Sequence, residues 1–161
     1  MVRTIALLAA LGMMTSPALA QAPVTASFKG VSGSVTVTPA PKGVLIHVEA
    51  SGLTPGWHGI HIHEKGDCSD AAFKLAGGHV HSATPVVHGL LNPAANDSGD
   101  LPNLYAAADG TAKAELFTTA VMMKSLQDAD GSAIVIHAKP DDYTSQPIGG
   151  AGDRVGCAVI R

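Results

Sequence analysis

Apolar and polar residues alternate along several short segments of the chain, and turn-forming residues separate these segments. Alternation with period two is typical of strands that bury one face. The Asp-Gly pair at positions 109 and 110 favours a tight hairpin turn, because both residue types tolerate positive φ angles. No stretch has the three-to-four spacing of an amphipathic helix. The pattern predicts an all-β domain, in which 34–38 pairs with 44–50 and 103–108 with 111–118, and further strands cover 60–63, 132–138 and 155–160.

The first twenty residues have the layout of an export signal. Arg3 supplies a positive charge, an apolar run covers residues 5–14, and the small-residue sequence Ala-Leu-Ala occupies 18–20. The apolar run is too short to span a bilayer and has the length of a signal-peptide core. We expect residues 1–20 to be cleaved, which leaves one secreted domain over 21–161 with no membrane segment.

Composition limits the partners of this domain. The chain has 10 Lys+Arg against 13 Asp+Glu, a formal net charge of −3, and only one Trp, two Tyr and three Phe. A chain without a basic run or a cluster of aromatic rings is not expected to bind nucleic acid. The two cysteines, Cys68 and Cys157, are expected to form one disulfide in an oxidising compartment.

Histidine is the residue type that suggests chemistry. Of the 8 histidines, five lie between positions 58 and 81. His61 and His63 would share one face of a strand and present two imidazoles side by side to a metal ion. His79 follows two glycines, and His137 closes an apolar run. Two long glycine-rich segments, 65–102 and 139–154, separate the predicted strands. Loops of that length are usually functional or disordered, and the histidines at their edges favour function. The sequence therefore predicts a metal site built from several segments.

Five strings in the sequence carry a resemblance to a known family. They are Trp57-His58-Gly59-Ile60-His61-Ile62-His63-Glu64-Lys65-Gly66-Asp67-Cys68, Gly77-Gly78-His79, Ser98-Gly99-Asp100-Leu101-Pro102, Ile136-His137-Ala138 with Asp141, and 149–160. In order and spacing they resemble the copper/zinc superoxide dismutases, most closely the exported bacterial branch, over nearly the whole chain after residue 20. The resemblance implies a flattened eight-stranded Greek-key β-barrel, an immunoglobulin-like sandwich with two long functional loops. It also implies a location in the bacterial periplasm and the conversion of two superoxide ions and two protons into dioxygen and hydrogen peroxide.

The resemblance also implies roles for individual residues. His79 would be shared between copper and zinc and would serve as a proton donor. Arg154 would dock the superoxide anion, since a guanidinium stays charged and hydrogen-bonds small anions. Asp141 would join a copper histidine to a zinc histidine from outside the two sites. Four imidazoles suit an ion that cycles between two oxidation states, and the implied copper ligands are His61, His63, His79 and His137.

The zinc side departs from the family pattern. His79, His88 and Asp100 match three zinc ligands, but Asp97 stands where relatives carry a further histidine. Asp97 is itself a candidate ligand, because carboxylates bind Zn²⁺ at distances similar to those of imidazole. His81 is an alternative, and an enzyme with copper alone is a third interpretation.

Other residues receive simpler interpretations. His47 is expected to be exposed, and the resemblance implies that His58 hydrogen-bonds backbone near the copper site. Residues 141–152 contain only two charged side chains, both aspartates, so Lys65 and Lys74 are the candidates for steering the anion.

Two functions and two assembly states stay open at this point. The alternative to an enzyme is a periplasmic copper-binding or copper-delivery module, although it would have no need of Arg154 or of all four copper histidines. A zinc hydrolase is disfavoured, because the sequence lacks the H-E-x-x-H arrangement. The sequence does not choose between a monomer and a homodimer.

Overall fold

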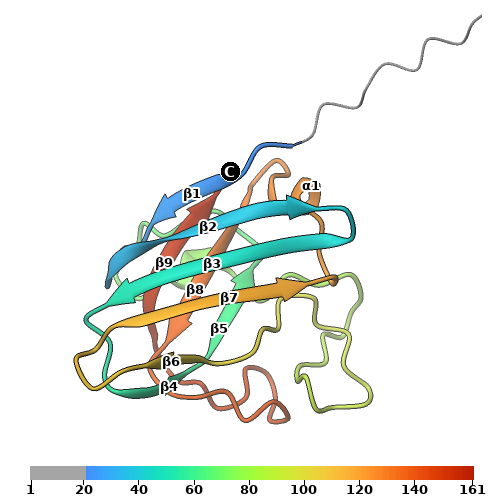
Figure 1. Ribbon diagram of the computed structural model, residues 1–161. Helices are drawn as coiled ribbons and strands as arrows, with labels where there is room; N and C mark the ends of the chain where they lie inside the picture. The colour runs from blue at the N-terminus through green and yellow to red at the C-terminus, as the bar shows by residue number, and fades with distance from the viewer. Residues whose placement is uncertain (1–20) are drawn as a thin grey trace, which may run out of the picture.

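A computed structural model describes residues 21–161 (Figure 1); the predicted signal over 1–20 lies outside them. The predicted all-β class is confirmed. The strands are β1 (Val24–Ser27), β2 (Ser32–Ala40), β3 (Gly43–Ser51), β4 (Gly56–His58), β5 (Ile60–His63), β6 (Leu104–Ala106), β7 (Ala112–Thr118), β8 (Ser132–His137) and β9 (Arg154–Ile160). Two short helical segments, η1 (Lys74–Ala76) and α1 (Met123–Leu126), accompany them.

The strands form two principal sheets that face each other and a small third one. One sheet has the order β1-β2-β3-β7, the second has the order β5-β8-β9, and β4 pairs with β6 at one end, where Figure 1 shows them below the larger sheets. Every pairing is antiparallel. At one edge Lys29 and Cys157 exchange two backbone hydrogen bonds, of 2.8 and 3.0 Å, which link the two principal sheets. This link partly closes one edge of the sandwich, as in the flattened barrel that the resemblance implied.

The core lies between the two principal sheets and follows the predicted alternation. In β3, Ile46 and Val48 are fully buried whereas Leu45 and His47 are partly exposed. His47 therefore faces solvent, as expected. From the opposite sheet, the isoleucines of β5 and β8 enter the same core, namely Ile60, Ile62, Ile134 and Ile136. Burying apolar side chains from both sheets is the main stabilisation of such a sandwich.

The predicted hairpin around Asp109-Gly110 is correct in its turn and wrong in its pairing. The turn forms, with Ala107 N–H donating to the Thr111 carbonyl at 2.7 Å. The two strands then separate, because β6 pairs with β4 and β7 pairs with β3. A turn signal is local, but the choice of partner strand depends on which neighbour completes the core.

Four elements were not predicted from the sequence. β1 and β4 are strands of 4 and 3 residues, and η1 and α1 have 3 and 4 residues. Elements this short do not complete a periodic pattern that could be recognised.

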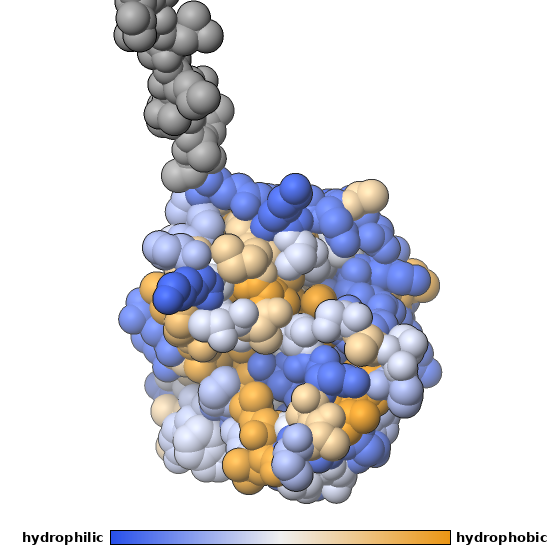
Figure 2. Space-filling model, turned by 90° about the vertical axis from the view of Figure 1, so that its right-hand side faces the viewer, coloured by the Kyte–Doolittle hydropathy of each residue, from blue (hydrophilic) through white to orange (hydrophobic). Residues whose placement is uncertain are grey.

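Two further features concern the surface of the described region. No helix within 21–161 is long and apolar enough to cross a membrane. On the side of the molecule seen in Figure 2, apolar residues lie in patches interrupted by polar ones. This side therefore resembles an ordinary water-exposed surface.

Candidate metal centre

Strand β5 supplies two histidines because of its alternation. Ile60 and Ile62 enter the core, so His61 and His63 point to the opposite face of the sheet. That face is also covered, and all four residues are 0% exposed. Part of the cover is a glycine-rich segment that runs along β5. The Ile62 N–H donates to the Gly99 carbonyl, and the Ile62 carbonyl accepts the Val80 N–H, both at 2.9 Å.

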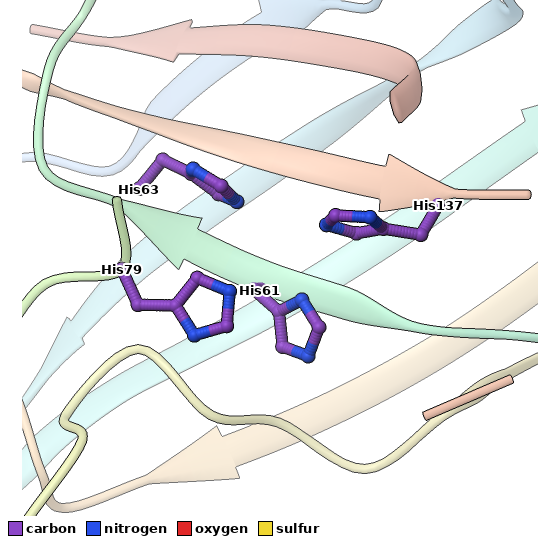
Figure 3. Close-up of side chains that lie close together, drawn as sticks. All are labelled: His61, His63, His79 and His137. Carbon is purple, nitrogen blue, oxygen red and sulfur yellow. The ribbon is translucent and has the colours of Figure 1, made fainter. Parts of the chain in front are cut away.

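This segment brings the third histidine to the site. His79 lies opposite His63 in an isolated β-bridge, and His137 stands at the end of β8. Figure 3 shows the four imidazoles turned toward one another from β5, β8 and the connecting segment. We call His61, His63, His79 and His137 the four-histidine group; one ligand nitrogen from each lies within 4.8 Å of the others.

The four-histidine group fits a metal ion because each of its rings has a buried nitrogen that forms no hydrogen bond to any described residue. In each ring one nitrogen is buried and without a hydrogen-bond partner among residues 21–161. They are Nδ1 of His61 and Nε2 of His63, His79 and His137. Buried polar atoms are rarely left unpaired in folded proteins, because desolvation without a partner is costly. Four such atoms converging on one point are the arrangement that a bound metal ion satisfies.

The opposite nitrogens of three of these rings are fixed by other groups. His63 Nδ1 donates to the Gly77 carbonyl at 3.0 Å, and His137 Nδ1 donates to the Gly152 carbonyl at 3.1 Å. His61 Nε2 lies 2.8 Å from Asp141 Oδ2. Such outer contacts set which nitrogen faces the metal.

A second group of ligand atoms adjoins the first and shares His61 and His79 with it. Its carboxylate and imidazole atoms come from His61, His79, His88 and Asp100. His88 Nδ1 and Asp100 Oδ1 lie 2.6 Å apart, yet neither has a properly oriented hydrogen bond within the described chain. An oxygen and nitrogens at this spacing fit a zinc ion.

Asp97, and not His81, adjoins this second group. Asp97 Oδ2 is 2.7 Å from His79 Nδ1 and 3.6 Å from His88 Nδ1, and its side chain is 0% exposed. The His81 ring instead donates from Nδ1 to the His79 carbonyl at 2.8 Å and lies near Glu64 on the surface.

Asp141 contacts one ring in each of the two groups. Its Oδ2 contacts His61 Nε2 at 2.8 Å, and its Oδ1 contacts His88 Nε2 at 3.0 Å. Both ring nitrogens are the ones that face away from the candidate metal positions. The single buried carboxylate therefore orients one ring in each group.

Burial and charge give the two groups opposite protonation tendencies. Burial, with nearby His79 and Arg154, lowers the pKa of His63 to about 2. Burial likewise lowers the pKa of His137, to about 3. In His88 burial also acts to lower the pKa, but the nearby carboxylates, first that of Asp100, outweigh it and raise the pKa to about 11. The rings of His63 and His137 are thus neutral and ready to bind a metal ion, whereas His88 holds a proton.

Arg154 begins β9 and reaches back toward the site. Its guanidinium donates to the Phe73 carbonyl and, at 2.7 Å, to the Gly77 carbonyl. Gly77 also holds His63, so Arg154 and the four-histidine group share a backbone acceptor. The side chain borders two surface hollows; Lys74 lines one and His79 the other.

The remaining predicted residues are placed as follows. Cys68 and Cys157 form the expected disulfide. His58 donates from Nδ1 to the His137 carbonyl at 2.6 Å, in agreement with the predicted backbone role. Of the two steering candidates, Lys74 borders the same hollow as Arg154, whereas Lys65 lines a separate one with Glu64.

Comparison with known proteins identifies the family of the chain. Residues 31–160 match the family model described as copper/zinc superoxide dismutase (SODC). The chain belongs to the copper/zinc superoxide dismutase family. The superoxide dismutase [Cu-Zn] of Caulobacter vibrioides is 62% identical over 136 residues, covering 81% of this chain and 78% of that protein. Copper and zinc are therefore the metals of this site.

Solved structures agree with the family assignment. A crystal structure of a double mutant of a superoxide dismutase-like protein from Bacillus subtilis has a TM-score of 0.78 and 35% identity, covering 84% of this chain and 95% of that one. The Cu/Zn superoxide dismutase from Brucella abortus has a TM-score of 0.70 and 28% identity, covering 86% and 99%. Both match the copper/zinc superoxide dismutase fold.

Sequence reasoning missed the backbone groups that complete the site. The carbonyls of Phe73, Gly77 and Gly152 hold Arg154, His63 and His137. Backbone acceptors leave no residue-type signal. The one available hint was the density of glycine around them, since glycine permits close approach of the main chain.

Proposed function

We propose that the protein removes superoxide through the four-histidine group, with Arg154 as the anion-docking residue. The observation that carries the proposal is the convergence of four unpaired, buried imidazole nitrogens within 4.8 Å. Two superoxide ions and two protons give one dioxygen and one hydrogen peroxide: one superoxide is oxidised and the other reduced.

The four-histidine group holds copper, which when bound supplies the redox chemistry by accepting an electron from one superoxide ion and returning it to the next. Neutral imidazoles are the form that binds metal, and the low pKa values of His63 and His137 keep these rings neutral at working pH. The surrounding cover excludes bulk water, because the group is at most 5% exposed.

Arg154 positions the substrate. Its guanidinium is anchored by two carbonyls and borders the hollow that also contains Lys74. A fixed cation that faces a small anion favours binding without requiring the protein to reorganise.

His79 is suited to hold a proton for the peroxide product. Burial acts to lower its pKa, but the adjacent carboxylates of Asp100 and Asp97 outweigh burial and raise it. The carboxylates lie on the Nδ1 side, so a proton carried at Nε2 faces the four-histidine group. His79 can therefore deliver one of the two protons that the reaction consumes.

Zinc is held by His79, His88 and Asp100, with Asp97 as the fourth ligand. The support for Asp97 is its buried carboxylate between the two imidazoles. The contact of His81 with a backbone carbonyl and its surface position argue against that alternative. The prediction is tested by metal analysis after zinc loading: Asp97→Ala should bind less zinc with little change in copper, while His81→Ala should match the parent. The reverse pattern would assign the ligand to His81, and a parent that takes up copper but no zinc would leave the copper-only enzyme.

The proposed setting is the periplasm. A disulfide persists in oxidising compartments, and the Cys68–Cys157 bond is consistent with export after removal of residues 1–20. Mass spectrometry of the protein from a periplasmic extract should give a chain that starts at Gln21.

The function is tested by measuring copper content and superoxide consumption together. Arg154→Ala should keep its copper and lose activity on the order of 100-fold, as when one fixed donor to a reacting anion is removed. Arg161→Ala, which alters an exposed arginine, is the matched control and should behave as the parent. Copper binding without dismutation by the parent would instead identify a copper-delivery module. Equal loss of copper and activity in Arg154→Ala would contradict the docking role.

A further inference from the structure

The position of Asp141 needs an explanation, because this residue lies in a segment without regular structure. Residues 138–153 connect β8 to β9 and contain no strand or helix. Asp141 nevertheless presents both carboxylate oxygens, at 2.8 and 3.0 Å, to rings of two different metal groups. A loop does not maintain such a geometry unless other groups fix it.

Asn103 fixes the main chain of Asp141. Its side-chain oxygen accepts the Asp141 N–H at 2.9 Å, and its side-chain nitrogen donates to the Asp141 carbonyl at 2.8 Å. One amide thus satisfies both backbone polar groups of a single residue. Asn103 directly precedes β6, which is paired with β4. It therefore ties the backbone of Asp141 to the end of a fixed strand.

Tyr143 closes the arrangement from the other side. Its backbone N–H donates to Asp141 Oδ1 at 2.6 Å, and its hydroxyl accepts the Asn103 N–H at 2.7 Å. Its carbonyl accepts Leu91 N–H at 3.2 Å, which adds the zinc-side segment to the same assembly. Tyr143 has a φ of 64°, a left-handed conformation that non-glycine residues seldom adopt. Backbone held in this region is often found where function requires a fixed geometry.

We propose that Asn103 and Tyr143 are positioning residues that hold the Asp141 carboxylate in place and thereby orient His61 and His88 toward copper and zinc. This inference rests on the proposed function. The other copper rings have independent supports, because His63 and His137 are held by backbone carbonyls. The zinc group depends more heavily on Asp141, which is the partner of the outer nitrogen of His88. We call the hydrogen bonds of Asn103 and Tyr143 around Asp141 the clamp. Loss of the clamp should therefore weaken zinc binding more than copper binding.

The first test measures metal affinity in the full-length mature protein. Asn103→Ala should weaken zinc binding on the order of tenfold, the lower end of the range for outer partners of metal ligands. Zinc affinity is measured by competition with a coloured chelator, and the geometry of the site is followed by the visible spectrum after cobalt(II) replaces zinc. Asn103→Asp should also weaken zinc, since a carboxylate accepts the Asp141 N–H but does not donate to its carbonyl.

Tyr143→Phe has a matched control in the chain. It removes only the hydroxyl that receives the Asn103 N–H, whereas Tyr105→Phe alters a tyrosine that is 54% exposed. We expect a changed cobalt spectrum and weaker zinc for the first variant and none for the second. Equal effects, or no effect in either, would overturn the role of Tyr143.

A double-mutant cycle separates positioning from general stabilisation. The clamp binds the backbone of Asp141, so Asp141→Ala removes the carboxylate and retains the bonds from Asn103. If Asn103 acts through the carboxylate, Asn103→Ala should have little further effect on zinc affinity in the Asp141→Ala background. The same factor in both backgrounds would show general loosening of the segment and would refute the proposal. Parent protein that binds zinc but does not consume superoxide would instead refute the proposed function and leave the clamp intact.

Discussion

Breaking the Cys68–Cys157 bond should destabilise the fold by an amount that depends on the number of residues between the two cysteines. The two cysteines are 89 positions apart in sequence. Closing a loop of this length removes entropy from the unfolded chain worth about 4.6 kcal/mol at 25 °C in the chain-entropy model, which is an upper figure. Both cysteines lie in the smaller apolar cluster, at 3% and 0% exposure. Replacing both with alanine should therefore cost more than reduction, because it also leaves a cavity.

The disulfide should also affect anion binding before the protein unfolds. Cys157 lies three positions after Arg154 in β9, and Phe73 and Gly77, whose carbonyls hold Arg154, lie shortly after Cys68. The bond thus ties the arginine to its acceptors. In reduced, copper-loaded and still folded protein, we expect azide to bind more weakly than in the oxidised protein.

Two measurements check this prediction. Urea unfolding of the metal-free protein, followed by circular dichroism, compares the oxidised parent, the reduced parent and the Cys68→Ala/Cys157→Ala variant. Azide titration of the copper-loaded forms measures the docking site. Oxidised and reduced proteins that agree within about 1 kcal/mol would refute the entropic argument. Unchanged azide affinity on reduction would refute the link to Arg154.

Three further predictions follow from the site. Lys74→Gln should lower the rate of superoxide consumption and the dependence of that rate on salt, while Lys65→Gln, in a different hollow, should change neither. Identical salt slopes in the two variants would show that Lys74 does not steer the anion. Because the pKa of His88 is raised to about 11, its contribution to metal-free stability is complete below about pH 6.5 and declines as the pH rises toward 11. Zinc must displace that proton, so zinc should be lost at a higher pH than copper during acid titration with metal analysis, and simultaneous loss would contradict the argument. Gly149→Ala should weaken zinc binding, because a Cβ there overlaps the Asp141 carboxylate. Gly150→Ala is the control, since Gly150 has a similar φ and open space around its Cβ position. Equal zinc affinities in the two variants would exclude this overlap as the cause.

Local patterns in the sequence were sufficient for most of the strands and for part of the site. The alternation of β5 placed His61 and His63 on one face opposite Ile60 and Ile62, and the structure has that arrangement. Side-chain direction in a strand depends only on the position along it, so a few residues determine it. The turn at Asp109-Gly110 was likewise predicted correctly from two residues.

Pairing between distant segments was decided by the tertiary structure. The turn signal did not reveal that β6 pairs with β4 and β7 with β3. The sequence also left both Asp97 and His81 open as the fourth ligand, since Asp97 stands three positions before Asp100 and His81 two positions after His79. The path of the glycine-rich segment along β5 turns one toward the second group and the other toward the surface.

The sequence by itself determined an all-β chain with paired histidines on a strand, two cysteines able to bridge, and a full set of residues resembling those of a known family. Only the tertiary structure decided how these residues meet. It joined His61 to His88 through Asp141, gave Arg154 its backbone acceptors and placed Asn103 against a loop 38 positions away. The physical reason is that periodicity acts over a few residues, whereas loops have no period and take their shape from long-range hydrogen bonds and packing.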